Sequence, residues 1–300
     1  MKVVTFFNNK GGVGKTTTII NLASYLSIYR EKKVLVVDLD PQSNSTQAIL
    51  PEEIWLEFYD PENRNTRKTI YDYFRDMEEG DANFNNIEIP VNEDQNSFKI
   101  SLIPGHPKLS IIDDTMSKSW SETLSGDKGA IRKLNWLNQL KKENTTFDYI
   151  LIDCPAGIEQ GFKNAIAGAN RAIVVTTAEI SAIRDADRIV GLLEASEIKN
   201  PELVVNRIRP AMIKKGEMMD VDDIVDLLSI DLIGVVPDDE YIITQTNKGE
   251  PVVTNSKAPS GKSYMEIARR ILGENVEVNI PGRDEGFFNK IKSFFSKGKH

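Results

Sequence analysis

The segment that most constrains the fold is residues 2–29, where an apolar run, a glycine-rich loop and a helical pattern follow one another. Residues 2–7 are mostly apolar, residues 8–17 read Asn-Asn-Lys-Gly-Gly-Val-Gly-Lys-Thr-Thr, and residues 19–29 have helical periodicity. This order predicts a strand, a loop and a helix. Backbone N–H groups of such a loop bind anions at the helix N-terminus, and a lysine at its end neutralises phosphate charge. The segment therefore predicts a phosphate site.

Further apolar runs predict a sheet around this unit. They lie at residues 34–38, 149–153, 172–177, 203–206 and 232–237. Because these runs do not alternate with polar residues, we expect strands that are buried on both faces, with the helical stretches between them as crossovers. The predicted fold class is α/β, a doubly wound, mainly parallel sheet with helices on both faces. A chain of 300 residues that is 40% hydrophobic is long enough to bury such a core.

Two segments stand apart from this pattern. Residues 51–98 are acidic and rich in Asn, which predicts a surface insertion outside the core, with a short helix around residues 69–77. Residues 281–285 contain Pro-Gly and predict a linker to a final helix at residues 286–300. We therefore expect one domain over residues 1–280, then the linker and the terminal helix.

The loop departs from the general pattern G-x-x-x-x-G-K-[ST] at one position, because Asn9 stands where that pattern has glycine, and it carries an extra lysine, Lys10. Lys10 to Thr17 resemble the deviant Walker A motif of the ParA/MinD superfamily of dimerising ATPases. The resemblance implies an ATP-dependent homodimer in which Lys10 reaches the partner's phosphates. The residues expected to hold ATP are Gly11, Gly12, Val13, Gly14, Lys15, Thr16 and Thr17, with Lys10 and Lys15 in catalysis and the Thr16 hydroxyl on Mg²⁺.

Acidic residues end two of the predicted strands, on the edge of the sheet where ligands bind in such folds. The resemblance implies that Asp40 positions the attacking water and that Asp38 and Asp153 belong to the magnesium shell, with Asp153 as the Walker B acid. It also implies that Gly157 lies in a switch that senses the γ-phosphate. Phosphoryl transfer needs positioning and charge neutralisation more than a strong base, so these groups suffice. The alternative is that the acids only cap the ends of strands.

Polar residues after two later strands occupy the places where this superfamily holds the adenine ring. Asn206 is a candidate for direct contact, because an amide both donates to and accepts from a purine edge. Arg207, Pro237 and Asp238 are further candidates, and for these an ordinary turn at a strand end is the competing interpretation.

The two parts of the chain resemble different branches of the superfamily. Residues 1–146, with Asp-Leu-Asp-Pro-Gln at 38–42, resemble ParA-type partition ATPases, and residues 147–300 resemble the MinD branch. A natural mosaic and an engineered chimera both remain open. The MinD-like helix that carries Asp185 and Asp187 implies contacts with MinC-like and MinE-like regulators, and a solvated, salt-bridged face is the alternative.

The distribution of charge separates the two branches. The formal net charge is −8, and residues 201–250 hold eleven acidic against five basic residues, which disfavours the non-specific DNA binding of the ParA branch. Residues 286–300 contain four lysines and no acid. On a helix, the apolar residues of this segment fall on one arc of about 120° with lysines outside it, as in an interfacial membrane helix. The residues expected to bind anionic membrane lipid are Phe287, Phe288, Lys290, Ile291, Lys292, Phe294 and Phe295.

The motifs, together with the resemblance to the MinD branch, imply a Mg²⁺-dependent ATPase that dimerises on ATP and binds the cytoplasmic membrane reversibly, to position the site of cell division. A ParA-type partition ATPase on DNA is the alternative, and a nucleotide switch with negligible turnover is the third hypothesis. Cys154 is the single cysteine, so no disulfide forms within the chain, and we expect a cytoplasmic protein, peripheral on the inner face of the membrane.

Overall fold

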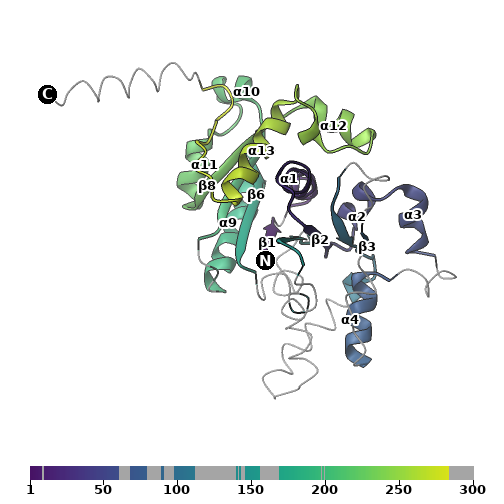
Figure 1. The fold of residues 1–300 in the computed structure, drawn as a ribbon. Helices are drawn as coiled ribbons and strands as arrows, with labels where there is room; N and C mark the ends of the chain where they lie inside the picture. The colour runs from purple at the N-terminus through teal and green to yellow at the C-terminus, as the bar shows by residue number, and fades with distance from the viewer. Residues whose placement is uncertain are drawn as a thin grey trace.

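The structure, a computed structural model, describes residues 1–8, 10–60, 68–79, 89–90, 98–111, 140, 142, 146–155, 169–196, 198 and 200–283. Gly157, Asn9 and the terminal segment 286–300 lie outside these residues. The described part is a sheet with helices on both faces (Figure 1).

The sheet has eight strands in the order β3-β4-β2-β5-β1-β6-β7-β8, and every neighbouring pair is parallel except β3 and β4. Strand β1 lies inside, and the order runs outward from it in both directions, which confirms the doubly wound, mainly parallel fold. The strands are β1 (Lys2–Phe7), β2 (Val34–Asp38), β3 (Ile89–Pro90), β4 (Ser101–Ile103), β5 (Tyr149–Asp153), β6 (Arg171–Thr177), β7 (Glu202–Ile208) and β8 (Asp231–Pro237).

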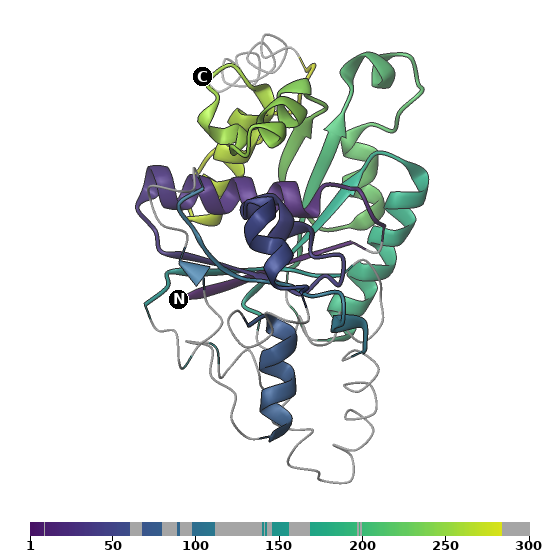
Figure 2. The ribbon, with the colours of Figure 1, turned by 90° about the vertical axis from the view of Figure 1, so that its right-hand side faces the viewer.

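Helices cover both faces, because side chains of the central strands are apolar on each side. Helices α1 and α13 belong to the core of one face, and α4, α9 and α11 to that of the other. Figure 2 shows α1 (purple) and α4 (blue) on opposite sides of the sheet. The helices are α1 (Lys15–Arg30), α2 (Asn44–Ile49), α3 (Glu52–Glu57), α4 (Ile70–Glu79), α9 (Ile180–Ala195), α10 (Pro210–Lys214), α11 (Val221–Leu228), α12 (Glu240–Asn247) and α13 (Pro259–Ile271), with a short 3₁₀ turn at Val252–Thr254.

The expectation that residues 51–98 lie outside the core is wrong for α4. Ile70, Tyr73 and Phe74 are almost fully buried and belong to the core beneath the sheet. The segment also supplies the edge strand β3. Helix α4 is strongly amphipathic, with its charged residues on the outer side. These acidic residues made the whole segment look like a surface insertion in the sequence. The short helix predicted around residues 69–77 is confirmed as α4.

The start of the predicted linker is held on the domain. Gly282 has a positive φ of 84°, and a Cβ atom there would lie 2.4 Å from the Cβ of Pro210. The Arg283 guanidinium pairs with Asp220 at 2.8 Å and with Asp222 at 2.5 Å. The last described residues, Gly282 and Arg283, therefore lie against the α10–α11 corner.

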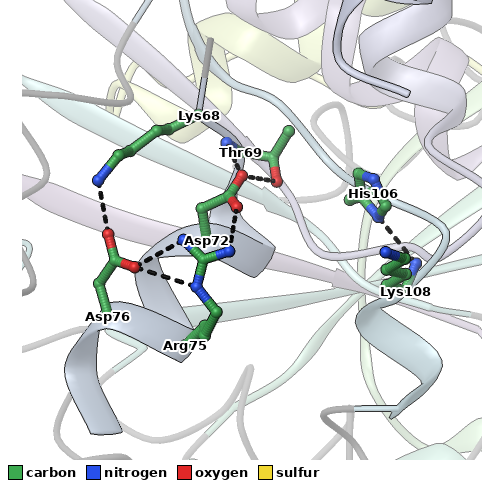
Figure 3. Close-up of polar contacts among 7 residues, drawn as sticks. All are labelled: Lys68, Thr69, Asp72, Arg75, Asp76, His106 and Lys108. Carbon is green, nitrogen blue, oxygen red and sulfur yellow. Dashed lines mark hydrogen bonds and ion pairs between the residues drawn. The ribbon is translucent and has the colours of Figure 1, made fainter. Parts of the chain in front are cut away.

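A charged network fixes the start of α4 (Figure 3). The backbone N–H and the hydroxyl of Thr69 donate to the same oxygen of Asp72, at 2.9 and 3.0 Å. Asp72 also faces Arg75 at 3.3 Å. A carboxylate in the first turn that accepts from the residue before the helix is one half of a capping box. This network orients the helix whose inner face fills the core.

Replacing Asp72 by alanine should lower the free energy of unfolding by about 1 kcal/mol, because the N–H of Thr69 loses its acceptor. Asp72→Asn keeps an oxygen at the same place and should lose less than half as much. Urea denaturation of the three proteins measures both values. Equal losses in the two variants would show that the charge, not the cap, stabilises α4.

Candidate nucleotide site

The glycine loop joins β1 to α1 in the conformation that a phosphate cradle requires. Gly12 and Gly14 have positive φ angles of 77° and 96°. A Cβ atom on Gly14 would lie 2.1 Å from the amide nitrogen of Asn206, so no other residue fits there without displacement. Helix α1 begins at Lys15 without a side-chain cap and without an acidic residue in its first turn. Its first N–H groups are therefore suited to an anion.

Two buried amides hold the loop from below. The Asn8 side chain donates to the carbonyl of Val175 in β6 at 2.6 Å and accepts from the N–H of Lys10 at 2.7 Å. The Asn206 side chain donates to the carbonyl of Val13 at 2.8 Å and accepts from the N–H of Arg207 at 2.9 Å. In each amide, one N–H of the side chain and the side-chain oxygen are therefore bonded to backbone groups of the protein. In this structure Asn206 supports the loop, a role that the sequence analysis did not assign to it.

The two lysines of the loop differ in environment. Lys15 is 6% exposed, and its ammonium lies 3.4 Å from the carbonyl oxygen of Asn8. Lys10 is about one-third exposed, forms an ion pair with Glu179 and donates to the hydroxyl of Ser181 at 2.9 Å. The ion pair lowers the pKa of Glu179, chiefly through the hydrogen bond from Lys10. The Lys15 ammonium therefore lies within the glycine loop, whereas the Lys10 side chain extends away from the loop to the start of α9.

The predicted acids meet at one point of the sheet. Asp38 and Asp153 are register partners at the ends of β2 and β5, and both are fully buried. Asp40 is 7% exposed and accepts from the N–H of Gln42 at 2.9 Å. Parallel strands place their carboxyl ends on the same edge, which is why acids 115 positions apart in sequence lie side by side. The geometry brings Thr16 to them: its hydroxyl donates to Asp153 at 2.7 Å.

Burial makes these carboxylates costly to ionise. Desolvation, followed by the charge of Asp153, raises the pKa of Asp38 well above its usual value, against hydrogen bonds from Thr46. Desolvation also raises the pKa of Asp153, against hydrogen bonds from Ser45 and Thr16 and the charge of Lys15. The pKa of Asp40 is raised by burial, and the Gln42 N–H and Lys15 oppose the rise. A cation at this point would relieve the repulsion.

The donor set fits Mg²⁺ bound together with phosphate. Among the residues that the structure describes, no group of three or more His, Cys, Asp and Glu could hold a metal ion alone. Mg²⁺ is usually bound by one or two protein groups, with substrate phosphates and water as its other ligands. One oxygen of Asp153, Oδ1, is buried without a hydrogen-bond partner, next to the carboxylate's contact with Thr16. Such an atom suits a bound ion or its water.

The other predicted residues are placed at the same edge or beside it. Pro237 ends β8, and Asp238 pairs with Arg209 at 2.6 Å. Arg207 is exposed and has a positive φ of 56°. Asp239, to which the sequence analysis gave no role of its own, caps α12 by accepting from the N–H of Tyr241. It also accepts two hydrogen bonds from Ser260, and an Asp directly before a helical pattern is a sequence signal for such a cap.

The predicted partner residues lie on α9. Asp185 is half-buried and Asp187 is exposed.

Cys154 is buried, and burial raises the pKa of its thiol well above the usual value, so a packing role fits it better than chemistry.

Comparison with known proteins identifies the family. Residues 1–205 match the model of a family described as "AAA domain". Septum site-determining protein MinD of Bacillus subtilis (strain 168) is 40% identical over 296 residues, which cover 98% of each protein. The chain belongs to the MinD family of these AAA domains.

One solved structure agrees with this assignment, and a more distant one shares the fold. In the MinC:MinD cell division protein complex of Aquifex aeolicus, a chain that is 32% identical superposes with a TM-score of 0.71 and covers 93% of this chain and 99% of its own length. MinD of Pyrococcus horikoshii OT3 complexed with Mg-ADP, which is 22% identical, shares the fold with a TM-score of 0.65 over 92% of this chain and 99% of its own.

Membership in the MinD family makes this chain an ATPase of cell division. The MinD relatives align with residues 1–146 as well as with the rest of the chain. No helix within the described ranges is long and apolar enough to cross a membrane.

The electrostatic cost at Asp38 predicts a stabilising substitution. Because the pKa of this carboxyl is raised in the folded state, the wild-type chain loses stability as the pH rises from the usual carboxyl pKa through the raised value. Asp38→Asn removes the charge and keeps an acceptor for Thr46. Without nucleotide or Mg²⁺, the variant should therefore melt at a higher temperature than the parent at about pH 7.5.

The gain should shrink as the pH falls towards the usual carboxyl pKa, because residue 38 is then neutral in both proteins. Thermal unfolding across a pH series measures the difference. A gain that is the same at every pH, or a lower melting temperature at neutral pH, would contradict this account of the site.

Proposed function

We propose that the glycine loop binds ATP with Mg²⁺ and that the hydrolysis of ATP to ADP and phosphate takes place at this edge of the sheet. The observation that carries the proposal is the convergence of Lys15, Thr16 and three buried acids at one edge of the sheet. The Mg-ADP complex of the Pyrococcus horikoshii relative supports it. Mg²⁺, when bound, neutralises phosphate charge.

The residues then have separate tasks. The loop N–H groups from Gly11 to Thr17 and the Lys15 ammonium hold the phosphates, and the Thr16 hydroxyl and Asp153 hold the metal, with Asp38 adding negative charge behind them. Asp40 orients the attacking water. Asn206, Arg207, Pro237 and Asp238 line the side proposed for adenine, and Gly157 is proposed to sense the γ-phosphate.

Asp40→Ala should lower the rate of phosphate release from ATP by about 100-fold or more, because the attacking water loses its acceptor. ATP binding should persist. Asp231→Ala is the matched control, since Asp231 is exposed at the start of β8, at the opposite edge of the sheet from Asp40. Equal release well above background from the parent chain and Asp40→Ala would show that Asp40 does not orient the attacking water. Negligible release from the parent as well would favour the third hypothesis, a nucleotide switch.

We infer that ATP joins two copies of the chain through Lys10. Its ammonium is partly exposed and is held at the start of α9 by groups that are themselves exposed, Glu179 and Ser181. Surface ion pairs of this kind contribute at most about 1 kcal/mol, so a phosphate of a second copy can replace Glu179. MinC-like and MinE-like regulators are proposed to contact α9 at Asp185 and Asp187, and the MinC:MinD complex of the Aquifex relative supports the first of these partners.

We propose that residues 286–300 bind anionic membrane lipid, so that the protein is peripheral on the cytoplasmic face. Each lysine near such a surface contributes about 1 kcal/mol, and each buried Phe or Ile about 1.5–3 kcal/mol. Ordering the backbone costs about 1–2 kcal/mol per residue, which offsets most of this. One tail is therefore marginal, and two tails on an ATP dimer bind together, which links membrane residence to nucleotide state.

Sedimentation with vesicles of phosphatidylglycerol and phosphatidylcholine tests this link. The full chain should pellet with Mg²⁺ and ATP and stay largely in the supernatant with ADP. Ile291→Glu places a charge on the apolar arc and should abolish pelleting. Ser293→Glu adds the same charge on the opposite side of the expected helix and should leave most of the pelleting intact.

DNA is the alternative binding partner to the membrane, because residues 1–146 resemble partition ATPases. That the chain combines two branches of the superfamily stays a prediction. Relatives named MinD span both parts of the chain, and the acidic charge of residues 201–250 disfavours DNA. Salt-sensitive, ATP-dependent binding to an arbitrary duplex, with no vesicle pelleting, would overturn the membrane proposal in favour of DNA.

A further inference from the structure

The segment after β2 forms hydrogen bonds with both Asp38 and Asp153, the acids at the proposed metal site. The Leu39 N–H donates to the Asp153 carbonyl at 2.9 Å, which continues the strand pairing beyond Asp38. Ser43 then takes a left-handed conformation with φ of 53°, and α2 begins at Asn44. This turn carries the chain back over the strand ends, so the first residues of α2 face the acids.

Two consecutive residues of α2 with hydroxyl groups each donate a hydrogen bond to a different acid. The Ser45 hydroxyl donates to Asp153 Oδ2 at 2.7 Å. The Thr46 hydroxyl and N–H both donate to Asp38 Oδ2, at 2.7 and 2.8 Å. Thr46 and Ser45 are fully buried, so water does not compete for these bonds. Neither residue has a role in the sequence analysis, which assigned functions in this segment to Asp38 and Asp40.

The bonds on Asp153 are unequal between its two oxygens. Oδ2 accepts from Thr16 and from Ser45, both at 2.7 Å, whereas Oδ1 is buried and accepts from no group in the described part of the chain. Two donors on one oxygen fix the rotation of a carboxylate, and a buried oxygen without a partner is costly unless a ligand completes it. The cost would disappear if Asp153 turned and shared its donors between both oxygens.

We propose that Ser45 is a positioning residue for the magnesium site, which holds Asp153 so that Oδ1 is the oxygen directed to the metal shell. Thr16 alone leaves the carboxylate free to rotate about one hydrogen bond, and Ser45 removes that freedom. Because Ser45 lies in the segment that also carries Asp40, the same bond ties the position of the water-orienting acid to the Walker B acid. The inference rests on the proposed nucleotide site and assigns one more residue to it.

The test measures how Mg²⁺ strengthens the binding of a fluorescent ADP analogue, using the full chain. Groups that orient a metal ligand typically change metal affinity by 10–100-fold when removed. Ser45→Ala should therefore raise the half-saturating Mg²⁺ concentration about 10-fold. Affinity for the analogue without Mg²⁺ should stay unchanged. Ser45→Thr restores the hydroxyl and should return the Mg²⁺ requirement towards that of the parent.

Ser24→Ala is the matched control. Ser24 is a fully buried serine of α1 whose hydroxyl has no hydrogen-bond partner among the described residues, so its removal creates a similar void without touching Asp153. This variant should keep the parent's Mg²⁺ requirement. If Ser45→Ala fails to fold, Ser45→Cys keeps the volume with a weaker donor and should still raise the Mg²⁺ requirement.

The outcomes separate the inference from the function beneath it. If Mg²⁺ does not strengthen analogue binding to the parent chain, the proposed nucleotide site itself is wrong. If the parent responds to Mg²⁺ but Ser45→Ala and Ser24→Ala behave alike, only the role of Ser45 is wrong. Equal weakening of binding with and without Mg²⁺ in Ser45→Ala would show a general structural role and would also overturn the inference.

Discussion

The site depends on one constraint, the burial of two carboxylates side by side at the ends of β2 and β5. Parallel pairing makes Asp38 and Asp153 register partners, and neither side chain reaches solvent. Two like charges in a desolvated place repel, and burial raises the pKa of each. Much of the surrounding structure acts to make this arrangement tolerable.

The compensation comes mainly from hydroxyls and from one lysine. Ser45, Thr16 and Thr46 donate to the two acids, and the charge of Lys15 favours ionised Asp153. This set stabilises the acids without matching their charge, so a divalent cation with phosphate completes it. A fold that bears such a cost at its binding edge gives up stability for function.

The proposed membrane binding of the C-terminal tail depends on the nucleotide site through dimerisation. The last described residue, Arg283, pairs with Asp220 and Asp222 at the α10–α11 corner, and the proposed tail follows it in sequence. The proposed tail is marginal alone, so its membrane binding depends on how many tails an assembly presents. ATP at the buried acids would set that number by joining two copies of the chain.

Strong local patterns made most of the sheet predictable. The apolar runs that end at Asp38, Asp153 and Thr177 became β2, β5 and β6, because a strand buried on both faces has an unmistakable composition. The glycine loop between β1 and α1 could likewise be predicted, since its glycines allow the backbone conformation that a phosphate-binding loop requires.

Long-range partners were harder to foresee. Asn206 supports the loop through Val13, and Ser45 orients Asp153, contacts that join residues far apart in sequence. Ile70 and Phe74 were assigned to the surface because acidic neighbours concealed the amphipathic pattern of α4. Such roles depend on which side chains the fold brings together, and no local pattern records that.

A structure of the full chain crystallised with Mg²⁺ and a non-hydrolysable ATP analogue tests the central claim most directly. The account predicts a metal ion about 2.1 Å from the Thr16 hydroxyl oxygen, with Asp153 Oδ1 directed to its shell and Ser45 still bonded to Oδ2. A metal ion bound away from Thr16 and Asp153, or an Asp153 carboxylate turned so that Oδ1 takes the hydroxyl bonds, would contradict it.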